Sequence, residues 1–200
     1  MRTVPRQLAG KLYAAADLIA EHGLDNTKID DIAEATGIPK ATLYYYFTGK
    51  EEILTFLLND MLAAITDGVA VALEAPGTAR DRLIGAVTAQ LCIMLQHPAA
   101  CRALVGDLGR ATRLPTLAAA LRTAFDQPIE QLLRDGAEDG TLHAGPDPTT
   151  SALVVFGAVT IAGLVHSVEA TNIEPDVLAT KITDVLLTGI GDRSASAVEP

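Results

Sequence analysis

Aromatic and sulfur-containing side chains are scarce in this 200-residue chain, which has no tryptophan, four tyrosines, four phenylalanines and two cysteines. Two cysteines, Cys92 and Cys101, cannot build a disulfide framework, so a disulfide-stapled secreted domain is excluded and a reduced, cytoplasmic setting is expected. The first residues lack the apolar stretch of a signal peptide, so we expect none. With 49% hydrophobic and 20% charged residues, the composition excludes disordered and collagen-like chains and favours a globular one.

Basic side chains are outnumbered, and the net charge of −10 by itself argues against a nucleic-acid partner. The charge is unevenly distributed, however. Residues 1–50 hold six basic and six acidic side chains, so the whole negative excess lies in residues 51–200. All four tyrosines lie within the first 46 residues. This division predicts two parts with different partners.

No segment has a convincing strand pattern, whereas apolar residues recur at helical spacing along most of the chain. We therefore predict an all-α fold of about nine helices. Glycine, proline and capping residues mark their ends, and Pro128 is expected to kink or split the seventh helix. The predicted helices cover about residues 8–22, 28–36, 40–46, 50–74, 78–96, 98–110, 115–140, 147–168 and 174–190.

The segment Thr149–Val168 contains no charged residue and is long enough to span a bilayer. Its threonines, its serines and His166 dilute the apolar character, and no aromatic or basic anchors flank it. A helix that is apolar on all sides can equally be buried in a globular protein. We expect the second arrangement and no membrane association.

The stretch from Lys28 to Tyr46 has the spacing of a helix-turn-helix. Ala33 is small enough for close helix contact, and Gly37, four residues later, tolerates the positive φ of a tight turn. Ile32, Ile38 and Leu43 would fix the crossing of the two helices. An ordinary helical hairpin can show the same pattern by chance.

The outer face of the second helix of this pair favours DNA binding over that alternative. Lys40, Thr42, Tyr45 and Tyr46 are polar or amphipathic and suit phosphate, sugar and thymine-methyl contacts. Some of the tyrosines are expected to pack locally instead, Tyr44 above all.

At these residues the sequence resembles the TetR family of bacterial transcriptional regulators. The resemblance covers about residues 8–55 and departs from the family's pattern at Asp30, Pro39 and Tyr46. It implies a three-helix DNA-binding domain (1–48), a helical ligand-binding and dimerisation domain (49–191) and a flexible tail (192–200). The matching residues are Gly23, Thr27, Ile32-Ala33, Gly37-Ile38, Leu43-Tyr44-Tyr45-Tyr46-Phe47 and Lys50-Glu51.

The expected partner of the first domain is a palindromic double-stranded operator. Lys40 and Thr42 are predicted to reach base edges, and Tyr45, Tyr46, Lys50 and the Thr27 cap region to hold phosphates. The predicted DNA-binding residues are Thr27, Lys28, Pro39, Lys40, Ala41, Thr42, Tyr44, Tyr45, Tyr46 and Lys50.

The second domain is expected to form a homodimer and to bind a small apolar effector, which releases DNA by moving the helix over residues 50–74. Scarce aromatics favour an aliphatic or alicyclic effector over a flat polyaromatic one. The candidate cavity residues are Met61, Leu91, Met94, Leu95, Leu104, Leu108, Leu121, Phe125 and Phe156. The predicted dimer contacts are Ala152, Phe156, Val159, Gly163, His166, Leu178, Ile182 and Val185.

No cofactor, metal site or catalytic set is expected. The four histidines lack metal-ligand spacing, and no nucleophile or phosphate-loop motif is present. The cysteines are interpreted as buried thiols, with a redox pair as the alternative. A helical enzyme or carrier whose N-terminus only mimics the motif remains the competing function.

Overall fold

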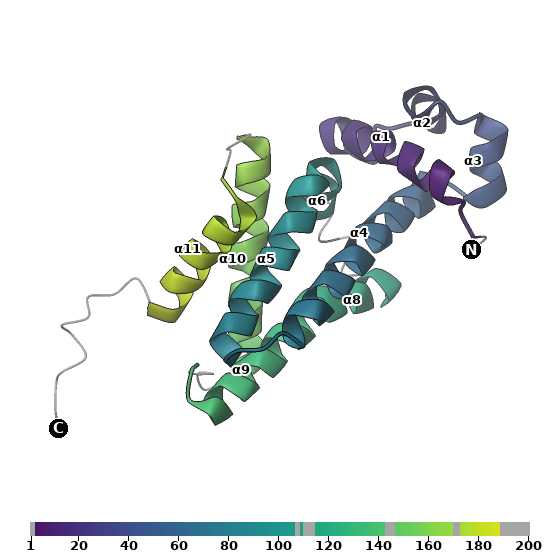
Figure 1. Ribbon diagram of the computed structural model, residues 1–200. Helices are drawn as coiled ribbons and strands as arrows, with labels where there is room; N and C mark the ends of the chain where they lie inside the picture. The colour runs from purple at the N-terminus through teal and green to yellow at the C-terminus, as the bar shows by residue number, and fades with distance from the viewer. Residues whose placement is uncertain (1–2, 107–108, 110–114, 143–146, 170–172, 189–200) are drawn as a thin grey trace.

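The computed structural model describes residues 3–106, 109, 115–142, 147–169 and 173–188, and these residues form helices and connecting turns without a strand. Figure 1 shows α1, α2 and α3 grouped at the N-terminal end and the remaining helices packed into a bundle that extends away from them. The elements are α1 (Arg6–His22), α2 (Ile29–Thr36), α3 (Lys40–Tyr46), α4 (Lys50–Leu73), α5 (Ala79–Gln96), α6 (Pro98–Gly106), α8 (Pro115–Leu121), the π-helical turn η1 (Arg122–Asp126), α9 (Gln127–Asp139), α10 (Pro148–Val168) and α11 (Pro175–Thr188).

The predicted helices are confirmed, and their ends follow the local chemistry that predicted them. The Thr78 hydroxyl accepts the N–H of Asp81, and the Asp147 carboxylate accepts the N–H groups of Thr149 and Thr150. The helix C-terminus at Gly140 needs a left-handed residue, with φ at +75°. The predicted tail, residues 192–200, lies outside the described residues.

The expected break near Pro128 takes the form of a π-helical turn. η1 connects α8 to α9 in one run of helix from Pro115 to Asp139. A π-helical turn admits one extra residue, so the run changes direction slightly without a loop. This turn puts Phe125 and Ala124 into the core, where both are buried.

Helix α4 connects the two parts of the molecule. It packs against α1 of the N-terminal helices and against α5 and the run of α8, η1 and α9 in the bundle. Buried side chains recur along it from Ile53 to Val69. They join the core of the N-terminal helices, which includes Leu12 and Phe47, to the core of the bundle. A shift of α4 in the bundle therefore reaches the N-terminal helices directly.

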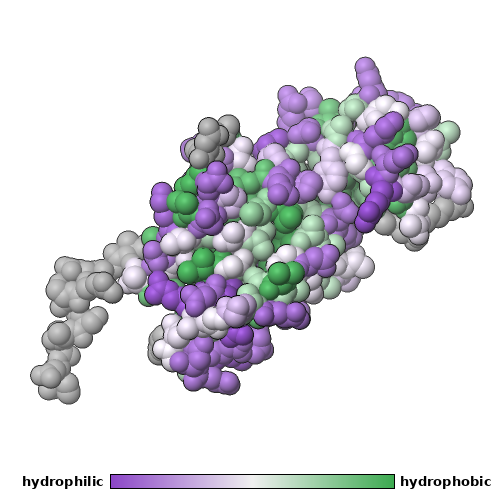
Figure 2. All heavy atoms as spheres, viewed as in Figure 1, coloured by the Kyte–Doolittle hydropathy of each residue, from purple (hydrophilic) through white to green (hydrophobic). Residues whose placement is uncertain are grey.

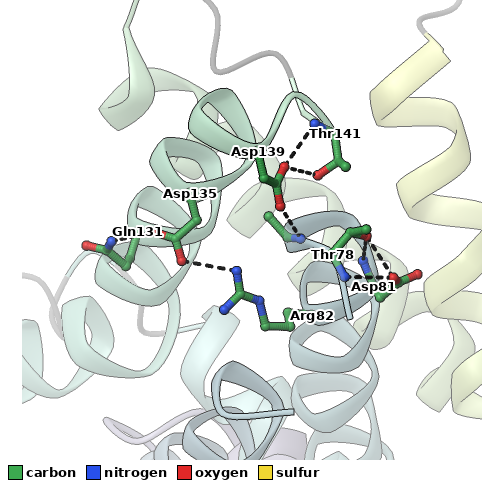
Figure 3. Close-up of polar contacts among 8 residues, drawn as sticks. Thr78, Asp81, Arg82, Gln131, Asp135, Asp139 and Thr141 are labelled. Carbon is green, nitrogen blue, oxygen red and sulfur yellow. Dashed lines mark hydrogen bonds and ion pairs between the residues drawn. The ribbon is translucent and has the colours of Figure 1, made fainter. Parts of the chain in front are cut away.

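Polar contacts lock the start of α5 to the end of α9, as Figure 3 shows. The Asp139 carboxylate accepts the N–H of Ala79 and the N–H of Thr141, each at 2.9 Å. Arg82 pairs with Asp135 at 3.3 Å on the same two helices. These bonds satisfy a free N–H at the start of α5 and fix the antiparallel pair at one end.

By length and composition α4 and α10 could each cross a membrane, and so could α5 and α6 together, which meet at a 98° bend. In this fold all of them pack against other helices of the bundle. On the face drawn in Figure 2, hydrophobic side chains interrupt the polar surface over the bundle.

Candidate nucleic-acid interface

The turn between α2 and α3 has the conformation that its sequence predicts. Gly37 is left-handed, with φ at +62°, and its N–H bonds the Glu34 carbonyl. The buried Thr36 hydroxyl donates to the Ile32 carbonyl at 2.7 Å and accepts the N–H of Ile38 at 3.3 Å. These bonds hold α3 at a fixed angle to α2.

Helix α3 buries one face and exposes the other. Leu43 and Phe47 are buried, and the Phe47 ring contacts Phe56 of α4 with ring centroids 5.7 Å apart. The sequence analysis did not single out Phe56, although it anchors this end of α3. The exposed side chains of α3 are Lys40, Ala41, Tyr44 and Tyr45.

The roles expected of the tyrosines are partly reversed. Tyr44 is 54% exposed and Tyr45 59% exposed, so the prediction that Tyr44 packs locally is wrong. The tyrosine that packs is Tyr46, which is half-buried and lies against the core and the edge of Tyr45. Thr42 is also half-buried. Helical spacing puts positions 40, 41, 44 and 45 along one face of α3.

Two residues predicted to lie near phosphates bond backbone carbonyls of the N-terminal helices and their turn. Thr27 is buried, and its hydroxyl donates to the Gly23 carbonyl at 2.8 Å, so its expected role as the N-cap of α2 is wrong. The N-cap of α2 is Lys28, whose N–H donates to the Asp31 carboxylate at 2.9 Å. The Lys50 ammonium donates to the carbonyls of Asp25 and Thr27, each at 2.9 Å. Lys50 thus holds the α1–α2 turn rather than projecting outward.

Lys40, the first residue of α3, forms an ion pair in the free protein. The Lys40 ammonium lies 2.6 Å from the Asp30 carboxylate of α2, and both side chains are exposed. This hydrogen bond raises the pKa of Lys40, so the side chain is fully charged at neutral pH. Lys28 and Pro39 are exposed beside the pair. The face therefore offers an amphipathic tyrosine surface with a cation held at its edge.

Known proteins share this arrangement. Residues 12–55 match the family model described as bacterial regulatory proteins, tetR family. The transcriptional repressor KstR2 of Rhodococcus jostii is 32% identical over 143 residues, which cover 68% of each chain. The chain belongs to the TetR family. It is a DNA-binding transcriptional regulator.

Solved structures of TetR-type regulators share the fold over nearly the whole chain. The fatty acid degradation regulator FadR of Bacillus halodurans has a TM-score of 0.78 at 20% identity and covers 96% of this chain and 100% of its own. FadR of Bacillus subtilis, solved in complex with stearoyl-CoA, has a TM-score of 0.73 at 19% identity, with 91% and 99% covered.

Most candidate effector residues of this TetR-family chain meet inside the bundle. Phe125 and Phe156 contact edge to face with centroids 4.9 Å apart, and Met94 and Leu91 pack under Gly163 of α10. Met61, Leu104 and Leu121 are also buried, Leu95 is half-buried, and Leu108 lies outside the described residues.

Two surface hollows among the described residues involve none of these candidates. One, of about 300 Å³, lies between α4 and the η1–α9 segment and is lined by Val69, Leu73 and Pro128 among others. The other, of about 230 Å³, lies between α1 and α6 beside Arg102.

Half of the predicted dimer contacts are buried inside the subunit. Ala152, Val159, Gly163 and Leu178 are buried in the core of their own subunit, so they are not free to meet a partner. Phe156, His166 and Ile182 are half-buried, and of the predicted contacts only Val185 is exposed, at 51%. A helix that is apolar on all sides gives no polar face by which to orient it, so the sequence could not indicate which stripe faces outward.

The two parts are joined by polar contacts that the sequence analysis did not single out. The Tyr13 hydroxyl of α1 donates to Asp60 of α4 at 2.7 Å, and the Tyr13 ring stacks on His97. Burial and the Asp60 carboxylate raise the pKa of Tyr13, so the phenol keeps the proton that it donates. Asp17 pairs with Arg102 of α6 at 3.6 Å.

The remaining candidates are placed as follows. Cys101 is buried, which raises the pKa of its thiol to about 11 and makes it a poor nucleophile. Burial also raises the pKa of Cys92. Within the described part of the chain no group of three or more His, Cys, Asp or Glu side chains could hold a metal ion.

Proposed function

We propose that this regulator is a cytoplasmic homodimeric repressor that holds a palindromic operator through its two α3 helices and is released by an aliphatic acyl effector. The observation that carries the DNA-binding part is the exposed face of α3. Lys40 stands at its N-terminal end, and Tyr44 and Tyr45 lie one turn further along. The N-terminal residues of such a helix are the ones that meet base edges in the major groove.

Support for two copies comes from the surface of the bundle. One recognition helix contacts too few base pairs to select a single site in a genome, whereas a two-fold pair contacts two half-sites. Seven of the ten exposed large hydrophobics among the described residues lie on α10 and α11. An apolar patch of this kind marks an interaction site. The seven are Leu153, Val154, Ile161, Val165, Val168, Val177 and Val185.

Support for an acyl effector comes from the core and from the relatives. The candidate residues on α4, α5, η1 and α10 are aliphatic or thioether side chains with one pair of phenylalanines, and all of them are buried or half-buried. Such a lining suits an alkyl chain. The stearoyl-CoA complex of the Bacillus subtilis regulator with the same fold favours a fatty acyl thioester over other aliphatic ligands.

The test is selection of binding sites from random DNA with the full-length protein, followed by gel shifts on the selected sequence. We expect two inverted half-sites, weaker binding at higher salt, and release by stearoyl-CoA. Lys40→Ala should relax the preference at the bases it contacts, by about 1–3 kcal/mol if the base is a guanine. Tyr44→Phe and Tyr45→Phe should weaken binding to all sequences similarly.

Four results would contradict parts of the proposal. If the selected DNA shares no common sequence, the proposed operator is wrong, and if it shows a single half-site, the proposed dimer is wrong. If planar cationic dyes release the DNA but fatty acids and acyl thioesters do not, the proposed effector class is wrong. Retention of full binding by all three variants would mean that α3 is not the helix that enters the groove.

A further inference from the structure

The π-helical turn before α9 has an unusual partner on α5. Pro128 has no N–H to give to the carbonyl of Ala124, four residues before it. The Gln90 side chain supplies a donor, because its Nε2 lies 3.1 Å from that carbonyl oxygen. Gln90 and Ala124 are both buried, with 1% and 0% of their surface exposed.

This bond fixes the orientation of the Gln90 amide. Since Nε2 faces Ala124, the acceptor Oε1 faces elsewhere, and it has no hydrogen-bond partner among the described residues. The same is true of the hydroxyl of Thr160 on α10, a residue that is 4% exposed. Buried polar atoms without a partner are unfavourable and rare in folded proteins, so each indicates a missing partner.

Both atoms belong to the region where the candidate effector residues meet. Ala124 precedes Phe125, whose ring contacts Phe156, and Phe156 lies one helical turn before Thr160. One turn after Thr160, Gly163 allows α10 to approach α5 so closely that a Cβ there would lie 2.9 Å from Met94. Leu91 of α5, next to Gln90, lies against the same glycine. Thus the two polar groups lie on helices that pack against each other, and the neighbouring side chains of α5, η1 and α10 are apolar.

The chemistry of the two groups limits the ligand that could pair with them. Gln90 Oε1 can only accept a hydrogen bond, whereas the Thr160 hydroxyl can donate or accept one. A carboxylate has no hydrogen to give Gln90, and an unsubstituted alkyl chain offers nothing to either group. A ligand hydroxyl can pair with both, because it donates to Gln90 Oε1 and accepts from Thr160.

We propose that Gln90 and Thr160 form a polar subsite within the effector site and select an aliphatic acyl ligand that carries a hydroxyl group on its chain. The inference rests on the proposed acyl effector and narrows it. An internal water molecule is the competing occupant, since it too can donate and accept.

The test compares the affinity of the full-length protein for stearoyl-CoA with its affinity for hydroxystearoyl-CoA, with the hydroxyl near the thioester, in mid-chain or at the terminal carbon. Calorimetry should show that one of the hydroxylated ligands binds about tenfold more tightly than stearoyl-CoA. Thr160→Val, which has the same shape without the hydroxyl, should abolish that preference, so that the hydroxylated ligand and stearoyl-CoA bind with equal affinity. The melting temperature of free Thr160→Val should stay equal or rise, because an unpaired polar atom is removed.

Thr183→Val is the matched control, because Thr183 is also buried in the bundle but its hydroxyl already donates to the Ala179 carbonyl. It should keep the preference for the hydroxylated ligand. Gln90→Met repeats the test from the other helix if Thr160→Val does not fold.

The outcomes separate this inference from the proposed function. If stearoyl-CoA binds but no hydroxyl position improves the affinity, or if Thr160→Val keeps the preference, the subsite is wrong and water is its occupant, while the acyl effector stands. If none of the four thioesters binds to protein that still binds its operator, the acyl effector and the subsite are both wrong.

Discussion

At the scale of single residues, we expect the ion pair of Lys40 and Asp30 to restrain DNA binding. Asp30 holds the ammonium and also places a negative charge beside the face of α3 that we propose to meet DNA. Asp30→Asn should therefore tighten binding to every sequence, by about fivefold at moderate salt, as gel shifts or fluorescence anisotropy would show.

Asp67→Asn provides the control for the change in net charge, because Asp67 is an exposed residue of α4. It should leave the affinity for DNA nearly unchanged. An equal gain in both variants would mean that overall charge, and not the Lys40 pair, limits binding.

Lys50 gives a second prediction at this scale, because its ammonium bonds two carbonyls of the α1–α2 turn. Lys50→Met should lower the free energy of unfolding by about 2 kcal/mol in urea titrations. The slope of log affinity for DNA against log salt should stay the same. A slope reduced by about one would instead show that Lys50 contacts a DNA phosphate.

Single residues also show what the sequence could and could not predict. Gly37 and Pro39 were informative because a positive φ and a missing N–H restrict where such residues stand. Thr27 was misassigned because two side chains, those of Thr27 and Asp31, stood within reach of the start of α2, and only the structure shows which one bonds its backbone. Tyr44 and Tyr46 could not be told apart because both lie in the last turn of a short helix.

At the scale of helices, the ends were predicted well and the orientation of α10 was not. Capping residues act on their immediate neighbours, so Thr78 and Asp147 indicate helix starts without tertiary information. The inward face of α10 depends on what α5 and η1 offer it. Neither the unpaired hydroxyl of Thr160 nor the π-helical turn at Arg122–Asp126 leaves a signal in hydrophobic periodicity.

The hydrogen bonds that join the start of α5 to the end of α9 predict a loss of stability in acid. Hydrogen bonds from Thr141 and from the N–H of Ala79 lower the pKa of Asp139. Its folded pKa lies below the unfolded value of about 3.9, so its contribution is present above that pH and is lost as pH falls through the folded pKa. Asp139→Asn should lower the melting temperature at neutral pH and make the loss below about pH 4 shallower.

Glu138→Gln serves as the control for this prediction, since Glu138 is the exposed neighbour of Asp139. Its melting curves should follow those of the parent from neutral pH into acid. Identical melting curves for Asp139→Asn and the parent would show that the hydrogen bonds of Asp139 add nothing to stability.

At the scale of the whole molecule, the exposed face of α10 and α11 predicts an isologous dimer. Val154 of α10 is 56% exposed on this face, and an arginine there would put a charge into the apolar contact. Val154→Arg should sediment as a monomer. The affinity for the operator should fall by about 100-fold. In a dimer, binding of one subunit to its half-site raises the effective concentration of the other subunit at the second half-site, and a monomer lacks this gain.

Val71→Arg is the matched control, because Val71 is 73% exposed but lies on α4, away from the proposed interface. It should sediment and bind DNA as the parent does. A monomeric parent would remove the dimer altogether, and dimeric Val154→Arg with full affinity would place the interface on another surface. If instead both arginine variants become monomers, α4 would belong to the interface, and movement of α4 by the effector would then act on the contact between subunits as well as on the DNA-binding helices.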